Sequence, residues 1–361
     1  MNIEINSRKL KERFITSQTK TELNCYKKRV NNIDVLDIDS KIILASSNSE
    51  NIIKIHDMES NNTIIKLEKK IEIKLNKDEA VVNLKFLNTI NYNETNSINY
   101  IYLALLTTDK TLKILSFNSK YSNKIQDLDD SITLHNDNYN YYYIVSSDKN
   151  KIANRNFIWI NLYSIVSISK EEDSLLIFNL DYKSNFCKNI IFEKQVNLKN
   201  KISDLIIDKS NNILITCSIY NSCINIVSLE NYDHIYTLEL NNYVCCLAVY
   251  NDSRQNILAT GDNHSLITLY DIKNSFLPFK VLKRTEYNIK KLQFSSCGMF
   301  IACLYDEAVF DIFNVDIEEC IFTCIKKLVI SDICLSSSLN VMFYLGEESI
   351  KEEGSISIIK Y

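Results

Sequence analysis

The stretch Ile257–Asp271, ILATGDNHSLITLYD, has the pattern of two short β-strands joined by a tight turn. Leu258 belongs to the first apolar segment, and His264 lies in the polar turn. Ile267 and Leu269 then alternate with polar residues on the second segment. Alternation with a period of two is typical of half-buried strands. The stretch therefore predicts a β-hairpin.

The same pattern recurs along the chain. Counted from the turn residue as zero, apolar residues fall at plus three, plus five and plus six, where only His56 departs from the rule. A short polar residue usually follows at plus seven. The seven turn positions are Glu50, Asp109, Glu172, Asn221, His264, Glu307 and Glu353. A register that holds in every copy indicates an internal repeat.

Seven units spaced roughly 43 to 63 residues apart, each with several short β segments, are typical of a propeller. The pattern resembles that of WD repeats, whose naming dipeptide occupies plus six and plus seven. Altered forms of the dipeptide are His56-Asp57, Phe178-Asn179, Tyr270-Asp271 and Phe313-Asn314. The chain contains no Gly-His dipeptide. We therefore expect little of the side-chain hydrogen-bond network of well-formed repeats, and more stabilisation from apolar packing.

These observations predict an all-β, seven-bladed WD-repeat-like β-propeller. Because the last repeat stops after its third strand, we expect an N-terminal strand to complete the last blade, since an open sheet edge would otherwise remain. The segments near Arg13–Thr16 and Leu23–Tyr26 are the two candidates. Residues 1–28 then form a basic segment with the closing strand, and residues 29–361 form the propeller, with an inserted loop at 118–156 that contains one outer strand.

Charge and cysteine content favour some function classes over others. The net charge is only −4, so no overall field favours nucleic acid or an acidic membrane. Residues 1 to 30 are an exception, with eight Lys or Arg against three Glu. Most of the eleven cysteines lie in apolar strand segments, which indicates free thiols in a reducing compartment. We expect neither a secretory signal nor a membrane span.

No motif predicts catalysis, a metal or a cofactor. None of the four histidines lies near a second ligand at a metal-binding spacing. Cys320 and Cys324 should share one face of a strand, but two thiols alone favour a structural pair. Phosphate-binding glycine loops and a Gly-x-Ser-x-Gly turn are missing. We therefore expect a protein that is not an enzyme, with Trp159 as a buried aromatic residue.

Carboxylates gather in the expected loops between second and third strands. These loops share one rim of a propeller, and an acidic rim repels phosphate and attracts basic segments. A rim that is merely solvated is the alternative. The candidate interaction residues are Glu50, Asp109, Glu172, Asp173, Asp262, Asp306, Glu307 and Glu353.

From Lys201 onward the chain resembles the third-subunit family of the THO complex. Cys-Ile-Asn-Ile precedes Ala-Thr-Gly by one repeat, the penultimate repeat contains VFDIF in place of a strand ending in Trp-Asp, and Glu-Gly stands before the final strand. The resemblance implies a WD-repeat scaffold in mRNA processing and nuclear export, nuclear or nucleocytoplasmic. It would bind a large helical THO subunit and reach mRNA only indirectly, with no membrane and no small-molecule substrate.

Two other functions stay open. One is a generic WD-repeat scaffold of another intracellular complex. The other is a nucleic-acid or lipid binder that uses the basic N-terminal segment, where Lys27, Lys28 and Arg29 are consecutive.

Overall fold

A computed structural model describes most of the chain. The described residues are 21–26, 30–38, 41–61, 64–76, 79–87, 100–118, 135–137, 140–147, 152–183, 186–198, 200–218, 220–252, 255–283, 287–305, 309–325, 330–336, 341–347 and 354–360. They form two compact units. The first unit lies within Asp34–Asn197, and the second combines residues up to Ile33 with Leu198–Tyr361.

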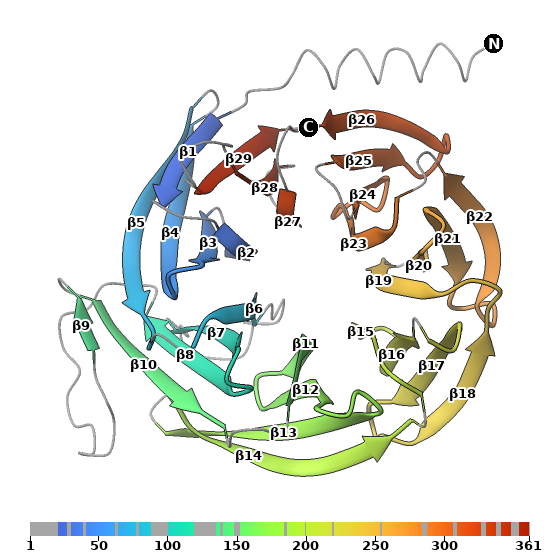
Figure 1. Cartoon of the computed structure of the whole chain (residues 1–361), viewed down its shortest axis with the longest axis horizontal. Helices are drawn as coiled ribbons and strands as arrows, with labels where there is room; N and C mark the ends of the chain where they lie inside the picture. Colours follow the sequence, from blue (N-terminus) through green and yellow to red (C-terminus); the bar gives the residue numbers. More distant parts are fainter. Residues whose placement is uncertain are drawn as a thin grey trace. The chain divides into compact units, whose positions relative to one another are not determined.

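Three antiparallel sheets account for strands β2 to β14 (Figure 1). Their orders are β2-β3-β4-β5, β6-β7-β8-β10-β9 and β11-β12-β13-β14. The bounds are β2 (Val30–Ile38), β3 (Lys41–Asn48), β4 (Ile52–Asn61), β5 (Ile64–Lys74), β6 (Val81–Phe86), β7 (Tyr100–Thr107), β8 (Leu112–Asn118), β9 (His135–Asp137), β10 (Asn140–Ser146), β11 (Ile152–Asn161), β12 (Ser164–Ser169), β13 (Ser174–Lys183) and β14 (Phe186–Asn197).

Four further antiparallel sheets belong to the second unit. Their orders are β15-β16-β17-β18, β19-β20-β21-β22, β23-β24-β25-β26 and β1-β29-β28-β27. The bounds are β1 (Thr21–Tyr26), β15 (Asp204–Asp208), β16 (Ile213–Ser218), β17 (Cys223–Ser228), β18 (His234–Glu239), β19 (Val244–Asn251), β20 (Asn256–Asp262), β21 (Leu266–Asp271), β22 (Leu277–Lys283), β23 (Ile289–Phe294), β24 (Phe300–Tyr305), β25 (Val309–Asn314), β26 (Glu319–Ile325), β27 (Ile330–Leu335), β28 (Val341–Glu347) and β29 (Gly354–Lys360).

Seven successive antiparallel sheets make this fold a seven-bladed β-propeller, as the repeat register predicts. The N-terminal strand β1 completes the last sheet, where Thr21 pairs with Ile358 and Tyr26 pairs with Gly354. The candidate segment Leu23–Tyr26 is thus confirmed as the closing strand. The other candidate, Arg13–Thr16, lies outside the described residues. Within the described ranges no helix is long and apolar enough to cross a membrane.

The inserted loop contains more pairing than the sequence predicts. The second sheet ends with β10 and β9, and both strands lie within the predicted loop at 118–156. Tyr142 of β10 pairs with Phe117 of β8, and the short β9 adds a fifth strand. The outer strand expected inside the loop is therefore confirmed as β10, and β9 is an additional strand that the sequence did not predict.

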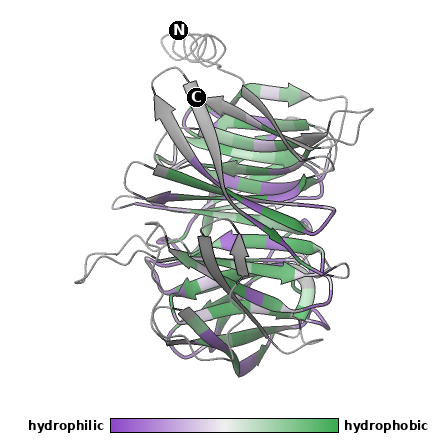
Figure 2. Cartoon of the chain, turned by 90° about the vertical axis from the view of Figure 1, so that its left-hand side faces the viewer, coloured by the Kyte–Doolittle hydropathy of each residue, from purple (hydrophilic) through white to green (hydrophobic). Residues whose placement is uncertain are grey.

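Stacking of the sheets explains why each repeat has two consecutive apolar residues in its third strand, at plus five and plus six from the turn residue. Leu269 packs with Ile289 and Ile301 of the following sheet, whereas Tyr270 packs with Ile215 of the preceding sheet. Both faces of a middle strand are thus buried, so its side chains do not alternate between core and water. Figure 2 shows the same distribution, with hydrophobic residues along the strands and many hydrophilic ones in the connections.

A β-bulge recurs in the outer strands at this same register. The pairing shifts between Ile55 and His56, Ile177 and Phe178, Ile226 and Val227, Leu269 and Tyr270, and Ile312 and Phe313. A bulge adds one residue to one strand and reverses the side-chain alternation beyond it.

This bulge overturns one prediction. Cys320 pairs with Phe313, whereas Cys324 pairs with Phe310 beyond the shift. Cys320 packs against the core shared with the preceding sheet, and Cys324 packs against the core shared with the following one. The two thiols therefore lie on opposite faces, and the expected same-face pair is wrong.

Three carboxylates on inner strands connect neighbouring sheets. Each accepts a hydrogen bond from a backbone N–H of the next inner strand. Asp34 accepts from Phe86 at 2.6 Å, Asp204 from Leu247 at 3.0 Å, and Asp332 from Ile33 at 3.1 Å. Trp159 makes a comparable link, because its Nε1 donates to the Lys85 carbonyl at 3.0 Å. The expected burial of Trp159 is confirmed, with 6% of the residue exposed.

Candidate interaction site

The predicted acidic residues occupy the turns between second and third strands where the structure describes them. Glu50 follows β3, Asp109 follows β7, and Glu172 with Asp173 follows β12, all in the first unit. Asp262 is the last residue of β20, in the second unit. Asp306, Glu307 and Glu353 lie outside the described residues.

These turns have a left-handed backbone residue, although the chain has only four glycines. Residues that have a Cβ rarely adopt a positive φ, so the backbone of such turns is strained. The residues concerned are Asn51 (φ 63°), Lys110 (φ 63°), Glu172 (φ 65°), Ser222 (φ 47°) and Ser265 (φ 64°).

Asp109 stabilises its own turn. Its Oδ1 accepts hydrogen bonds from the hydroxyls of Thr107 at 2.6 Å and Thr111 at 2.8 Å. Partial burial acts to raise the pKa of Asp109, but these hydrogen bonds, a backbone hydrogen bond from Thr111 and the charge of Lys113 outweigh it, so the pKa is lowered. Much of the hydrogen-bond-accepting capacity of this carboxylate is therefore used within its own turn.

Asp262 has a similar structural task. Its Oδ1 accepts the backbone N–H groups of His264 and Leu266, each at 2.8 Å. Its Oδ2 accepts a hydrogen bond from Nδ2 of Asn242 at 2.6 Å, and Asp262 is 5% exposed. Asn48 holds the β3–β4 turn in the same way, because its Oδ1 accepts the N–H of Ile52 at 2.9 Å. The β3–β4 turn and the β20–β21 turn are thus both held by a short polar side chain.

Glu50 and Asp173 are the more exposed members of the predicted set. Asp173 still accepts hydrogen bonds from Ser174 Oγ at 2.9 Å and Ser169 Oγ at 3.3 Å. Most of the acidic residues in these turns therefore hold the turn in place. The exposed carboxylates, those of Glu50 and Asp173, lie in the turns between strands.

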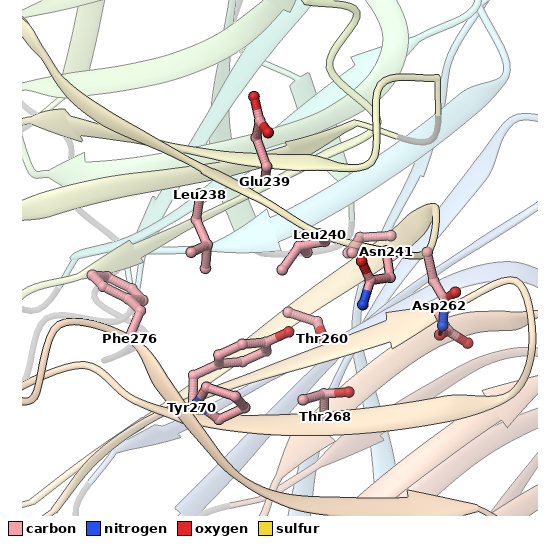
Figure 3. Close-up of a pocket in the computed structure, with 12 residues that line it drawn as sticks. Leu238, Glu239, Leu240, Asn241, Thr260, Asp262, Thr268, Tyr270 and Phe276 are labelled. Carbon is pink, nitrogen blue, oxygen red and sulfur yellow. Dashed lines mark hydrogen bonds between the residues drawn. The ribbon is translucent and has the colours of Figure 1, made fainter.

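A pocket of about 350 Å³ lies in the second unit, between the β18 end of one sheet and β20 to β22 of the next (Figure 3). Sequence reasoning identified one of its residues, Asp262. The apolar walls come from Leu238, Leu240, Val244, Phe276 and Pro278. The polar lining comes from Glu239, Asn241, Asn242, Thr260, Asp262 and Thr268. Its size is at the small end of the range for ligand sites, roughly 300–1,000 Å³.

Tyr270 forms one wall of this pocket. The residue is 7% exposed, and Figure 3 shows its hydroxyl directed toward Thr260. Burial raises the pKa of Tyr270, while hydrogen bonds with Thr260 and Thr268 partly oppose the increase. The phenol therefore presents a neutral aromatic face at physiological pH.

Charge at the pocket is of one sign. Glu239 and Asp262 are carboxylates, and the described lining residues include no Lys, Arg or His. In Figure 3 the Glu239 carboxylate points away from Leu238 and Leu240. Glu239 is exposed and its carboxylate extends from the opposite face of β18, close to Cys223, whereas Asp262 is buried and accepts three hydrogen bonds. The pocket thus combines carbon walls with one buried carboxylate that is already hydrogen-bonded.

Thiol chemistry is disfavoured where thiols are buried. Burial raises the pKa of Cys187 to about 12, and it also raises the pKa values of Cys217, Cys246 and Cys303. A thiol that stays protonated is a poor nucleophile and a poor metal ligand. Among the described residues no group of three His, Cys, Asp or Glu lies close enough together to hold a metal ion. The buried cysteines Cys187, Cys217, Cys223, Cys246 and Cys303 are not in disulfides.

No protein-family model matches the chain, and no curated protein matches it either.

Proposed function

We propose that this protein is a non-catalytic scaffold that binds other proteins through its second unit. One observation carries the proposal. On the outer strand β22, three large apolar residues are exposed to solvent: Leu277 by 62%, Phe279 by 48% and Val281 by 53%. Several exposed apolar side chains on one short edge strand favour burial against a partner protein.

The position of β22 supports this reading. Within its sheet β22 pairs with β21 alone, so it is the edge strand. Pro278 of β22 lines the pocket, so the exposed strand and the pocket form one continuous surface. We call this surface, composed of the pocket and residues 277–283, the β22 surface.

The identity of the complex is a finer proposal. The resemblance from Lys201 onward supports a subunit of the THO assembly, nuclear or nucleocytoplasmic, which binds a large helical subunit. The protein would contribute no chemistry and would reach mRNA through that subunit. The acidic turns would then attract basic segments of the assembly.

Affinity purification tests the proposal. The tagged full chain should recover partner proteins, and Phe279→Ser with Val281→Ser should remove most of them. Tyr163→Ser is the matched control, because Tyr163 is 62% exposed but lies in the first unit. Recovery unchanged by the double variant would refute the β22 surface. A large helical subunit with export factors would support the THO proposal, whereas other assembly proteins alone would reject it.

Binding of nucleic acid or lipid through the basic N-terminal segment is the second candidate. Its support is the excess of eight Lys or Arg over three Glu in residues 1 to 30. RNA binding that weakens steeply with salt, and that is lost on deletion of residues 1–20, would favour it. Absence of binding to RNA and to anionic vesicles at low salt would remove it.

A further inference from the structure

We propose that a row of three exposed tyrosines on the second unit binds a proline-rich segment of the partner protein. The inference rests on the proposed scaffold function and adds a second contact surface with its own ligand chemistry. The tyrosine row consists of Tyr220, which is 50% exposed, Tyr243, which is 47% exposed, and Tyr287, which is 40% exposed. Exposed tyrosines are enriched where proteins bind one another.

The three tyrosines lie at the same end of neighbouring sheets. Tyr220 belongs to the β16–β17 turn, Tyr243 to the β18–β19 connection and Tyr287 to the β22–β23 connection. The N–H of Leu240 donates to the Ser222 carbonyl at 2.7 Å. This hydrogen bond joins the β16–β17 turn to the β18–β19 connection, so the first two tyrosines belong to adjoining segments.

The β20–β21 turn continues the row to the third tyrosine. The N–H of Asn263 donates to the Tyr243 carbonyl at 3.1 Å, and Oγ of Ser265 donates to the Tyr287 carbonyl. One turn thus contacts the connections on both sides of it. These connections lead into β19 and β23, which lie side by side (Figure 1). The three tyrosines therefore follow one continuous run of contacts within the second unit.

Local contacts hold the row in place before a partner binds. Ser222 (φ 47°) and Ser265 (φ 64°) keep left-handed backbone conformations, which persist only where the surroundings fix them. Nζ of Lys201 lies 5.1 Å from the centroid of the Tyr220 ring, a cation–π contact that orients the ring. Tyrosine itself has few rotatable bonds, so little entropy is lost on binding. The row is therefore a preorganised surface.

The chemistry of the row matches a polyproline II segment. Such a segment has no internal hydrogen bonds, so its backbone carbonyls accept from a partner, and its proline rings pack on aromatic faces. The tyrosine rings supply those faces, and hydroxyl and amide groups supply donors. Each tyrosine has an exposed asparagine one or two positions away in the chain: Asn221, Asn241 and Asn288.

The charge of the row disfavours strongly charged ligands. The described residues of these turns and connections, 200–203, 220–222, 240–243, 263–265 and 287–288, include one lysine, Lys201, and no carboxylate. The adjoining strand ends carry both signs, as in Glu239 and Lys283. A nucleic-acid strand needs a run of cations, and a basic segment needs a run of carboxylates. An uncharged proline-rich segment needs neither.

Calorimetry with short peptides tests the proposal. The probe is acetyl-(Pro)10-amide, titrated into the full chain, and its comparison peptide is acetyl-(Gly-Ser)5-amide. Both are uncharged and equal in length, but the Gly-Ser chain is flexible and has no rings, so it should bind about tenfold more weakly or less. Equal affinity for the two peptides, or no binding of the proline peptide at millimolar concentration, would overturn the proposal. Tighter binding of a ten-residue oligouridylate would also overturn it, in favour of nucleic acid.

Two protein variants locate the contact. Tyr243→Ala should weaken the proline peptide about fivefold or more, whereas Tyr243→Phe, which keeps the ring, should retain most of the affinity. The matched control is Tyr163→Ala, an exposed tyrosine of the first unit, which should leave binding unchanged. Equal loss in Tyr243→Ala and Tyr163→Ala would contradict the site.

Hydrogen exchange of the unmodified protein decides the matter if Tyr243→Ala melts at a lower temperature and so has a folding defect. The proline peptide should slow exchange in 220–222, 240–243, 263–265 and 287–288. Slowing elsewhere alone contradicts the site.

This inference and the scaffold function fail differently. Partner recovery that depends on Phe279 and Val281 but not on the tyrosine row would keep the scaffold and reject the proline-rich contact. Recovery that depends on the tyrosine row alone would keep this contact and reject the β22 surface. Recovery that depends on neither surface would reject both.

Discussion

Single residues in the turns show how a glycine-poor chain makes tight hairpins. Lys110 adopts φ 63°, and its N–H donates to the Thr107 carbonyl at 2.9 Å. A left-handed residue with a Cβ is less favourable by about 1–2 kcal/mol, whereas glycine there is free of this penalty. The sequence predicts the turn but not which residue is left-handed, because Asn, Lys, Glu and Ser all take that position.

Replacing Lys110 by glycine should therefore stabilise the protein. Relief of strain exceeds the extra entropy of glycine in the unfolded chain, so we expect a gain of about 0.5–1 kcal/mol in the free energy of unfolding. Urea titration measures it. The matched control is Thr108→Gly in the same turn, where φ is not positive and glycine should destabilise. Equal losses in both variants would contradict the strain argument.

Asp109 should contribute to the acid sensitivity of the fold. Its pKa is lowered in the folded protein, since hydrogen bonds and Lys113 outweigh burial. A lowered folded pKa gives stability above the unfolded pKa, near 3.9, and this stability is lost as pH falls through the folded value. Wild type should therefore lose more stability than Asp109→Asn between pH 5 and pH 3. Parallel urea midpoints at both pH values would show that Asp109 plays no such part.

Among elements, the inner strands are linked by side chains that the repeat pattern does not identify. Asp204 accepts the N–H of Leu205 at 2.9 Å through Oδ1 and that of Leu247 at 3.0 Å through Oδ2. A signal exists in the sequence, because Asp34, Asp204 and Asp332 each come directly before an apolar residue of an inner strand. Only the fold shows that the second acceptor oxygen reaches the next sheet.

Asp204→Ala should destabilise the protein by about 1–3 kcal/mol, because it leaves the part-buried N–H of Leu247 without its acceptor. Glu230→Ala, an exposed carboxylate in the same unit, should change stability by less than about 0.5 kcal/mol. Chemical denaturation compares the two. If the two variants unfold at the same denaturant concentration, the link between β15 and β19 is not a stabilising contact.

A structural feature can be predicted from the sequence when residues close together in the chain determine it. Ile267 and Leu269 reveal their strand through spacing alone. The bulge opposite Phe313 has no such signal, so the placement of Cys320 and Cys324 on one face was wrong. The pocket is harder still, since Leu238, Thr260 and Phe276 come from separate strands or connections and each resembles ordinary core.

At the scale of the whole molecule, the fold depends on a segment far from the repeat it completes. β1 pairs with β29 from Thr21 to Tyr26, although more than 300 residues separate the partners. Without β1, the backbone groups of β29 on that side would be an unpaired edge, and open edges promote association between chains. The sequence predicted this strand because the last repeat stops after its third strand. The pairing of β1 with β29 shows which segment supplies it.

Deletion of residues 1–26 should therefore lower the melting temperature and produce concentration-dependent aggregation. The matched control is deletion of residues 1–20, which removes much of the basic segment and keeps β1. Light scattering and thermal unfolding at several protein concentrations measure both effects. Because β1 contributes a full row of strand pairing, the longer deletion should lose several kcal/mol, whereas the shorter one should unfold like the full chain. Equal stability of the two deletions would show that the last sheet stands without its N-terminal strand, and equal loss would assign the effect to the basic segment.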